Sequence, residues 1–232
     1  MNDAAMITAP HAQPAPAALP NAAALLFLLA ATLYMLLDAS GTKALWMAAL
    51  KVVPIGLLFW LAANRLSGAT RTLALLALGF SAIGDVLLAV PFANHFIFGL
   101  GAFLLAQLTY TATFVRRGKL SLCLAGRAFA VLVAVILLGR QVLPAAGELA
   151  LPVGLYILAI SAMALSAAAH RSGSSLLFAG ALTFMASDAL IAINRFVDPV
   201  PLAGTWIMLT YYAAQALLVV GLIRADLAPP RA

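Results

Sequence analysis

The stretch TLALLALGFSAIGDVLLAV, residues 72–90, decides the fold of this chain. At about 1.5 Å of rise per residue, a helix of this length nearly crosses the ~30 Å hydrocarbon layer of a membrane. The stretch has to be helical there, because each unpaired backbone amide in lipid costs several kcal/mol. One ionisable side chain, Asp85, lies inside it. The stretch therefore predicts a membrane-spanning helix and, within it, a candidate for a buried polar site.

Composition extends this prediction to the whole chain. Of the 232 residues, 65% are hydrophobic and 9% are charged, whereas a soluble protein has about 45–50% apolar and about 25% charged residues. The net charge is +6, but the basic residues are scattered through short connections without an aromatic and basic patch, so we expect no nucleic acid partner. The single cysteine excludes an intrachain disulfide.

Working outward from residues 72–90, we predict an all-α fold, a polytopic membrane bundle of eight transmembrane helices. A disordered Pro/Ala-rich N-terminal tail (1–21) precedes the eight-helix transmembrane domain (22–226), and a short C-terminal tail (227–232) follows it. The spans are apolar runs of about 17–22 residues, a length suited to membrane helices. They lie at residues 22–38, 44–63, 72–90, 95–115, 122–142, 151–169, 174–193 and 202–223.

The distribution of basic residues predicts the orientation of the bundle. Eight spans put both termini on one side, and lysine and arginine in short loops stay on the cytoplasmic side. The side of the termini collects nine basic residues, namely Arg65, Arg71, Arg116, Arg117, Lys119, Arg127, Arg171, Arg224 and Arg231. The opposite side has Lys43, Arg140 and Arg195. We therefore expect an integral, multi-pass protein of a bacterial inner membrane with both termini in the cytoplasm.

Two short motifs recur in the second half of the sequence. Residues 54–57, PIGL, resemble residues 152–155, PVGL, and residues 84–89, GDVLLA, resemble residues 187–192, SDALIA. Membrane bundles are often built from duplicated halves with the site between them. The recurrence favours a parallel 4+4 repeat of four helices each.

Three ionisable side chains lie inside the predicted spans: Lys51, Asp85 and Asp188. A charge at the centre of the bilayer costs about 2.5–3.5 kcal/mol, so each is a candidate functional residue. Lys51 with one aspartate could also form a structural ion pair. Two acids and one base, however, leave one carboxyl group without a cationic partner, and this favours the functional interpretation.

Neutral polar side chains follow a helical spacing in the fourth and eighth spans. Gln107 and Tyr110 are three residues apart, as are Tyr212 and Gln215, and residues three apart share one face of a helix. We predict that these four side chains line a pocket between four or five helices and bind substrate together with Lys51. The alternative is that they are hydrogen-bonding contacts between helices. We interpret Ser81, Thr109 and Tyr211 as structural.

The two acids predict acid and base chemistry. If Asp85 and Asp188 lie close together, one stays protonated while Lys51 keeps the other ionised, so that one donates a proton and the other activates water. We expect no cofactor and no metal, because the histidines lie in the tail or at the ends of spans. The glycines Gly99 and Gly101 lie within an apolar span and are interpreted as close-packing positions.

These residues also carry a resemblance to a known family, the YhhN family. The motifs lie in order along the spans: Lys51-x-x-Pro54, Gly84-Asp85-Val86-Leu87-Leu88, Phe98-Gly99-Leu100-Gly101-Ala102-Phe103-Leu104 leading to Gln107-x-x-Tyr110, Ser187-Asp188-Ala189-Leu190, and Thr210-Tyr211-Tyr212-Ala213-Ala214-Gln215. Each motif is short, but five in this order form a fairly specific signature over residues 44–224. One departure is Gln107, where the family often carries a histidine.

The resemblance implies an eight-helix lysoplasmalogenase surrounded by membrane lipids. Such an enzyme hydrolyses the vinyl ether bond of a lysophospholipid substrate, lysoplasmalogen, to a fatty aldehyde and glycerophospho-ethanolamine or glycerophospho-choline. Both acids would lie ~8 Å inside one boundary of the bundle by helical rise, near the depth of a vinyl ether. The alternative is a small-molecule or lipid transporter or carrier with a polar intramembrane cavity. Headgroup preference and oligomeric state stay open.

Overall fold

The computed structural model describes residues 21–116, 118, 122–170 and 175–227. Within these residues eight helices are long and apolar enough to cross a membrane. The predicted tails, 1–21 and 227–232, lie outside the described residues except for Asn21 and Leu227, which belong to helices. The prediction of an all-α polytopic membrane bundle with eight spans is confirmed.

The helices follow the predicted spans closely. They are α1 (Asn21–Ala39), α2 (Trp46–Arg65), α3 (Gly68–Ala89), α4 (His95–Val115), α5 (Leu122–Ala145), α6 (Ala150–Ala168), α7 (Ser175–Ala192) and α8 (Ala203–Leu227). A short 3₁₀ turn, η1 (Gly147–Leu149), precedes α6, and a π-helical turn, η2 (Ile193–Val197), continues α7. The largest differences from the prediction are at the start of α3 and the end of α8.

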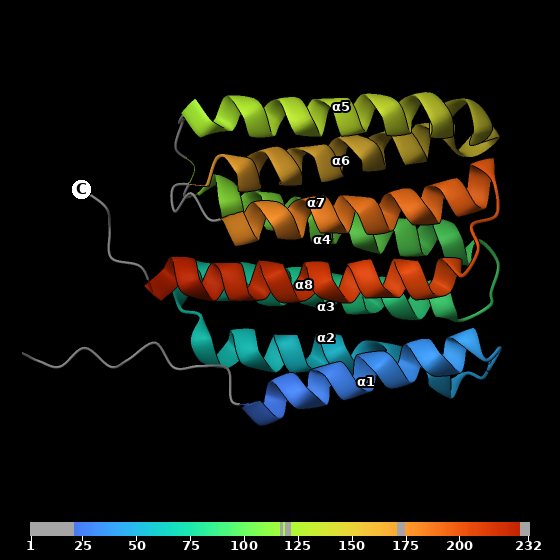
Figure 1. Ribbon diagram of the computed structural model, residues 1–232, viewed down its shortest axis with the longest axis horizontal. Coiled ribbons are helices and arrows are strands. Elements are labelled where there is room, and N and C mark those ends of the chain that lie inside the picture. Colours follow the sequence, from blue (N-terminus) through green and yellow to red (C-terminus); the bar gives the residue numbers. More distant parts are fainter. Residues whose placement is uncertain (1–20, 117, 119–121, 171–174, 228–232) are drawn as a thin grey trace, which may run out of the picture.

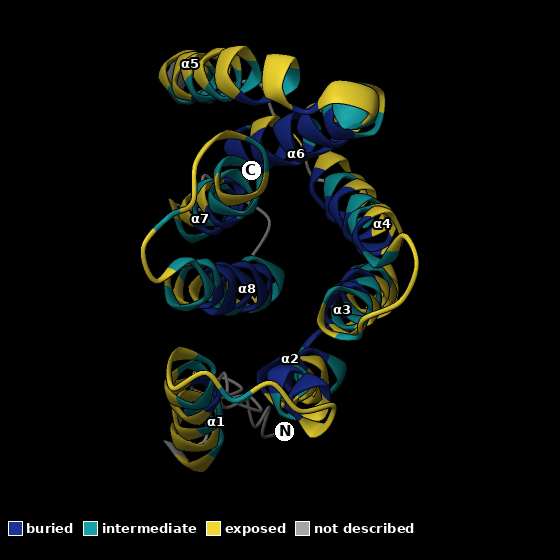
Figure 2. Ribbon diagram, turned by 90° about the vertical axis from the view of Figure 1, so that its right-hand side faces the viewer, coloured by how far each residue is buried: buried dark blue, intermediate teal, exposed yellow. Residues whose placement is uncertain are grey.

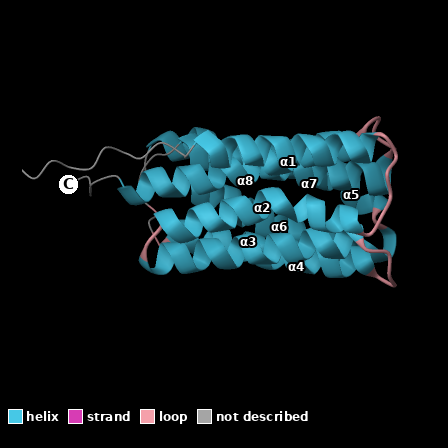
Figure 3. Cartoon of the chain, turned by 90° about the horizontal axis from the view of Figure 1, so that it is seen from below, coloured by secondary structure: helices cyan, strands magenta, loops and turns pink. Residues whose placement is uncertain are grey.

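All eight helices run nearly along one axis, up and down in turn (Figures 1 and 3). Asn21 and Leu227 therefore lie at the same end of the bundle, which we call the terminal end. The opposite end carries the connections 40–45, 90–94 and 198–202, and we call it the distal end. Positive φ angles at Gly41 and Asn94 help to turn the chain in two of these connections.

The neighbours of each helix follow a regular order (Figure 2). Helix α2 packs on α3 and α3 on α4, then α4 on α6, α6 on α7, α7 on α8, and α8 back on α2. The first helix of each half is peripheral, with α1 on α2 and α8, and α5 mainly on α6. A parallel repeat would produce such an order, and the 4+4 repeat stays a prediction.

Glycines bring α3 and α4 into the closest contact. A Cβ atom at Gly84 would lie 2.7 Å from the Phe103 ring, and one at Gly99 would lie 2.5 Å from Leu88 Cδ2. The helices could not approach this closely with larger residues at these positions. The close-packing interpretation is thus confirmed for Gly99. It is wrong for Gly101, which faces outward with no atom within 4 Å of a Cβ there.

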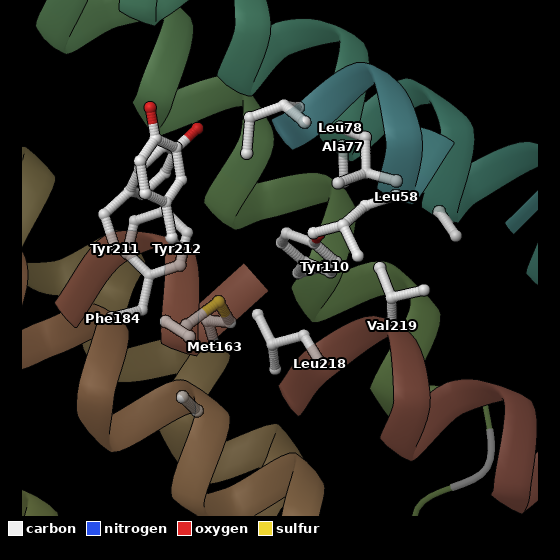
Figure 4. Packing of buried hydrophobic residues seen from close by; sticks show 14 of the residues in the cluster. Leu58, Ala77, Leu78, Tyr110, Met163, Phe184, Tyr211, Tyr212, Leu218 and Val219 are labelled. Atoms are coloured by element: carbon white, nitrogen blue, oxygen red, sulfur yellow. The ribbon is translucent and has the colours of Figure 1, made fainter. Parts of the chain in front are cut away.

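The interior between the helices is filled by apolar side chains from all eight of them, and the residues labelled in Figure 4 come from α2, α3, α4, α6, α7 and α8. Fully buried members include Leu78 on α3, Met163 on α6, Phe184 on α7 and Leu218 on α8. The Tyr211 and Tyr212 rings lie side by side among them, with centroids 5.6 Å apart. This packing fixes the helices that carry the predicted polar residues.

Helix α5 crosses the bundle even though it carries two arginines. It is long and apolar enough to span a membrane. The Arg127 guanidinium lies near the terminal end, 5.1 Å from the centroid of the Phe178 ring, and Arg140 is exposed toward the distal end. Both cations therefore lie toward the ends of the helix, where long side chains can extend toward opposite membrane surfaces.

Candidate active site

Lys51 and Asp85 form a buried ion pair between α2 and α3. Lys51 Nζ lies 3.2 Å from Asp85 Oδ1, and the two residues are 8% and 1% exposed. The Tyr211 hydroxyl on α8 donates a hydrogen bond of 2.7 Å to Asp85 Oδ2. Both carboxylate oxygens are therefore engaged, one by a cation and one by a phenol, and this arrangement suits an ionised aspartate.

Further buried hydrogen bonds join the helices around this ion pair. The Tyr212 hydroxyl donates to the Lys51 carbonyl at 2.8 Å. On the same face of α8, Gln215 Nε2 donates to Ser81 Oγ at 2.9 Å, and its Oε1 accepts from the Tyr110 hydroxyl at 2.7 Å. We call these side chains the Asp85 network: Lys51, Ser81, Asp85, Tyr110, Tyr211, Tyr212 and Gln215. It joins α2, α3, α4 and α8.

Asp188 on α7 belongs to a second, smaller network. Its Oδ2 accepts a hydrogen bond of 2.6 Å from the Tyr156 hydroxyl on α6 and a longer one of 3.4 Å from Gln107 Nε2 on α4. Among the described residues, no lysine, arginine or histidine forms an ion pair with Asp188. We call Gln107, Tyr156 and Asp188 the Asp188 network. Its carboxyl group has hydrogen-bond donors but no cation.

Asp188 lines an apolar pocket between α4, α6 and α7. The pocket has about 50 Å³ of free space, room for a few heavy atoms. Tyr156 and Asp188 bring the polar groups, and the surrounding wall includes Phe96, Phe103 and Met185. A hydrocarbon segment that enters this pocket would lie beside the Asp188 carboxyl group in otherwise apolar surroundings.

A larger and more polar cavity lies at the distal end, and we call it the vestibule. It has a volume of about 620 Å³ and lies between α1, α2 and the 40–45 connection. Its lining residues include Tyr34, Asp38, Thr42, Lys43, Lys51 and Leu88. Lys51 thus connects the vestibule with Asp85, which lies behind it.

The two networks adjoin without a direct bond between the acids. Leu88, three residues after Asp85 on α3, lines both the apolar pocket and the vestibule. The Tyr211 ring, whose hydroxyl binds Asp85, lies 5.7 Å from the Phe103 ring, and Phe103 lines the apolar pocket. No described hydrogen bond or ion pair joins Asp85 to Asp188. The predicted site residues therefore fall into two adjacent groups rather than around one polar pocket.

The structure adds two tyrosines to the predicted set. Tyr156 makes the shortest hydrogen bond to Asp188, and Tyr211, which we interpreted as structural, binds Asp85. A tyrosine inside an apolar span was the available signal, but tyrosine is also common near membrane surfaces. In the described part of the chain, no three histidine, cysteine, aspartate or glutamate side chains gather as metal ligands.

Comparison with known proteins links these residues to a family. The family model described as the YhhN family matches residues 46–222, which include every residue of both networks. The chain is also similar to proteins named lysoplasmalogenase. The Mycobacterium tuberculosis protein is 38% identical over 152 residues, 62% of this chain and 58% of the relative. The chain therefore spans less than two thirds of the mycobacterial relative.

Mammalian relatives are matched over most of their length. Lysoplasmalogenase TMEM86A of Bos taurus is 30% identical over 219 residues, 86% of this chain and 88% of the relative. Lysoplasmalogenase TMEM86B of Homo sapiens is 33% identical over 208 residues, 86% of this chain and 85% of the relative. No solved structure matches the chain. The match of the family model over most of the chain, together with these relatives, shows that the chain belongs to the YhhN family.

Proposed function

We propose that this protein is a lysoplasmalogenase, a membrane hydrolase that cleaves the vinyl ether bond of a lysophospholipid to a fatty aldehyde and a glycerophospho-headgroup. The relatives bear this name. The observation that carries the proposal is the pair of unlike carboxyl groups. Among the described residues, Asp188 has no cationic partner and lines an apolar pocket, whereas Asp85 is paired with Lys51 behind the polar vestibule.

The two cavities match the two parts of such a substrate. The glycerophospho-headgroup is polar and fits the vestibule, and the first carbons of the alkenyl chain fit the apolar pocket. The rest of the chain stays among the membrane lipids, because the pocket has room for only a few atoms. Since Leu88 lines both cavities, the vinyl ether would lie at the boundary that Leu88 forms.

We assign the first proton transfer to Asp188. Its Oδ2 is occupied by Tyr156 and Gln107, and its Oδ1 is left to hold the proton. Vinyl ether hydrolysis begins when an acid protonates the β-carbon. The electron pair of the C=C bond takes this proton, and the α-carbon becomes an oxocarbenium centre bonded to the ether oxygen. Asp188 is left as a carboxylate beside this positive charge and stabilises it.

We assign the activation of water to Asp85. Water adds to the oxocarbenium carbon and gives one proton to Asp85. The product of this addition is a hemiacetal. In the collapse of the hemiacetal, Asp188 takes the proton of the new hydroxyl and the proton held by Asp85 goes to the departing glycerol oxygen. Both acids then return to their initial states, and the sum is one vinyl ether plus one water to one aldehyde plus one alcohol.

The remaining predicted residues would orient these groups. Gln107 Oε1 is buried and has no hydrogen-bond partner in the described part of the chain, and a buried acceptor without a donor costs about 1–3 kcal/mol. A water molecule or a substrate hydroxyl beside Asp188 would supply that donor. Tyr212 would hold the Lys51 backbone against α8, and Tyr110 and Gln215 would fix α3, α4 and α8 to one another around the ion pair.

The orientation in the membrane belongs to the same proposal. Lys43, Arg140 and Arg195 lie toward the distal end. The terminal end has five of the described basic residues: Arg65, Arg71, Arg116, Arg127 and Arg224. By the preference of lysine and arginine for the cytoplasm, the termini would be cytoplasmic in a bacterial inner membrane. The vestibule would then open toward the outer leaflet, where a lysophospholipid headgroup could enter it.

The test uses the purified full chain with a lysoplasmalogen and the matched lysolipid that has a saturated ether. We expect aldehyde from the vinyl ether lipid alone. Asp188→Asn should lower aldehyde release at least a hundredfold, because an amide cannot donate the proton as a carboxylic acid does. Asn keeps the shape and the hydrogen bond from Tyr156, so the variant should remain folded, as circular dichroism and size-exclusion chromatography would verify.

Asp85→Asn should also lose at least a hundredfold in turnover. Asp198→Asn is the matched control, since Asp198 is exposed at the same end and outside both cavities. Full activity in both buried variants would refute the assignment. Movement of the lipid across vesicle membranes without any aldehyde would identify a carrier instead.

A further inference from the structure

The vestibule contains a second ion pair that the proposed chemistry does not use. Asp38 lies at the last turn of α1, and Lys43 lies in the connection to α2. Lys43 Nζ is 2.6 Å from Asp38 Oδ1, with side chains 73% and 19% exposed, respectively. Both residues line the vestibule. The pair thus combines a partly enclosed carboxylate with a largely exposed ammonium group.

The start of α8 provides the room for the Asp38 carboxylate. A Cβ atom at Gly204 would collide with Asp38 Oδ2, so the absence of a side chain there lets the carboxylate lie against the second residue of α8. The N-terminus of a helix also carries a partial positive charge that favours an anion. Asp38 is therefore held in place by the fold, independently of Lys43.

Lys43, in contrast, can leave Asp38 at little cost. Ion pairs between exposed side chains contribute little to stability, because water and salt screen the charges and the side chains lose freedom. The contact nevertheless places a primary ammonium group on the Asp38 carboxylate in hydrogen-bond geometry. An external primary amine could replace that of Lys43, and the released Lys43 ammonium would then be available for an anion nearby.

A phosphoethanolamine headgroup has this pair of charges, with an ammonium two carbons from a phosphate. We propose that Asp38 and Lys43 form a headgroup subsite, in which Asp38 accepts hydrogen bonds from the ethanolamine ammonium and Lys43 binds the phosphate. The subsite rests on the proposed function, since it positions the substrate of that reaction. A choline headgroup fits it less well, because its quaternary nitrogen has no N–H to donate to Asp38.

The geometry with respect to the catalytic groups agrees with this assignment. Lys51 lines the same vestibule, and its ammonium group forms the ion pair with Asp85. A headgroup fixed on Asp38 and Lys43 would direct its glycerol toward Lys51 and Leu88, where the apolar pocket begins. The subsite is thus a specificity element at the end of the vestibule away from the reacting carbons.

The experiment compares three vinyl ether lysolipids with the same chain: phosphoethanolamine, N-acetylated phosphoethanolamine and bare phosphate. Wild-type protein should have a kcat/KM about tenfold or more higher for the free amine than for the acetylated amine. Asp38→Asn should lower kcat/KM for the free amine to the level of the acetylated lipid, and leave the bare phosphate lipid unchanged. Lys43→Gln should lower kcat/KM for all three lipids.

Two controls separate recognition from a structural role of the pair. Asp198→Asn removes an acid at the same end outside the vestibule and should keep the wild-type preference. A direct binding measurement uses soluble glycerophosphoethanolamine and glycerol 3-phosphate, each added before thermal unfolding. The amine compound should stabilise the wild type more than Asp38→Asn, whereas glycerol 3-phosphate should not distinguish the two proteins.

The failures of the two proposals are distinguishable. If wild-type and Asp38→Asn proteins release aldehyde with the same preference for the free amine, the subsite is refuted and the hydrolase stands. If the wild type releases no aldehyde from any vinyl ether lipid, the proposed function is refuted. The subsite is also refuted if glycerophosphoethanolamine stabilises both proteins equally.

Discussion

Replacement of Lys51 by methionine should be one of the most damaging single changes to the stability of this protein. The substitution keeps an unbranched side chain and removes the only ion-pair partner of Asp85 among the described residues. At the observed separation of 3.2 Å, and with an effective dielectric constant of about 20, the lost attraction is about 5 kcal/mol. The Tyr211 hydrogen bond to Asp85 Oδ2 remains, but it cannot neutralise the charge.

Without Lys51, the Asp85 carboxylate can take up a proton, and this limits the loss in the free energy of unfolding. For an aspartic acid of ordinary acidity this costs about 4 kcal/mol at pH 7, so we expect Lys51→Met to lower the free energy of unfolding by about 3–4 kcal/mol, within the range for breaking a buried pair. Asp85→Asn should cost less, because Lys51 borders the vestibule and its ammonium can turn toward water. The double variant should be more stable than the sum of the two losses predicts.

Unfolding is measured in mixed micelles by titration with a denaturing detergent, followed by circular dichroism. Lys43→Met is the matched control, because it breaks an exposed ion pair in the same cavity and should cost less than about 1 kcal/mol. A loss below about 1 kcal/mol for Lys51→Met, or strict additivity in the double variant, would show that the buried pair does not hold α2 to α3 electrostatically.

The other predictions concern a hydrogen bond and a helix contact. Tyr156→Phe should lower aldehyde release tenfold or more with little loss of stability, because it removes the 2.6 Å hydrogen bond to Asp188 without changing the ring; unchanged kcat/KM would contradict the role of Tyr156. Gly84→Ala should lower the free energy of unfolding by about 1–3 kcal/mol through overpacking against Phe103. Gly79→Ala on the same helix meets no atom within 4 Å and should be neutral or slightly stabilising, since alanine favours helices by up to about 1 kcal/mol. Equal stability of the two alanine variants, measured by thermal unfolding, would exclude the overpacking argument.

The sequence predicts the number and centres of the spans because both depend on local properties, length and hydropathy. It is less successful at their ends. Helix α3 begins at Gly68, before Arg71, and α8 extends past Arg224 to Leu227. A polar residue ends the hydrophobic contact with lipid, but it does not end the backbone hydrogen bonding of a helix, so the helices continue into water.

The sequence predicts which residues belong to the site better than it predicts which of them contact one another. The cost of a charge in lipid singles out Lys51, Asp85 and Asp188, but which acid receives the cation depends on helix neighbours that no local pattern encodes. Gln107 and Tyr110 share a face of α4 as predicted, yet they belong to different networks. Three residues of helical rise, about 4.5 Å, are enough for one residue to reach α6 and α7 and the other to reach α8.

The partners of each acid come from both halves of the chain. Asp85 on α3 is bound from α2 and from α8, and Asp188 on α7 is bound from α6 and from α4. Neither the first four helices nor the last four contain a complete carboxyl centre. During synthesis at the membrane, Asp188 can acquire its partners once α7 has been inserted, whereas Asp85 lacks Tyr211 until α8 has been inserted and has packed against α3. The two carboxyl centres that the proposed chemistry needs are therefore both complete only when the last helix is in place.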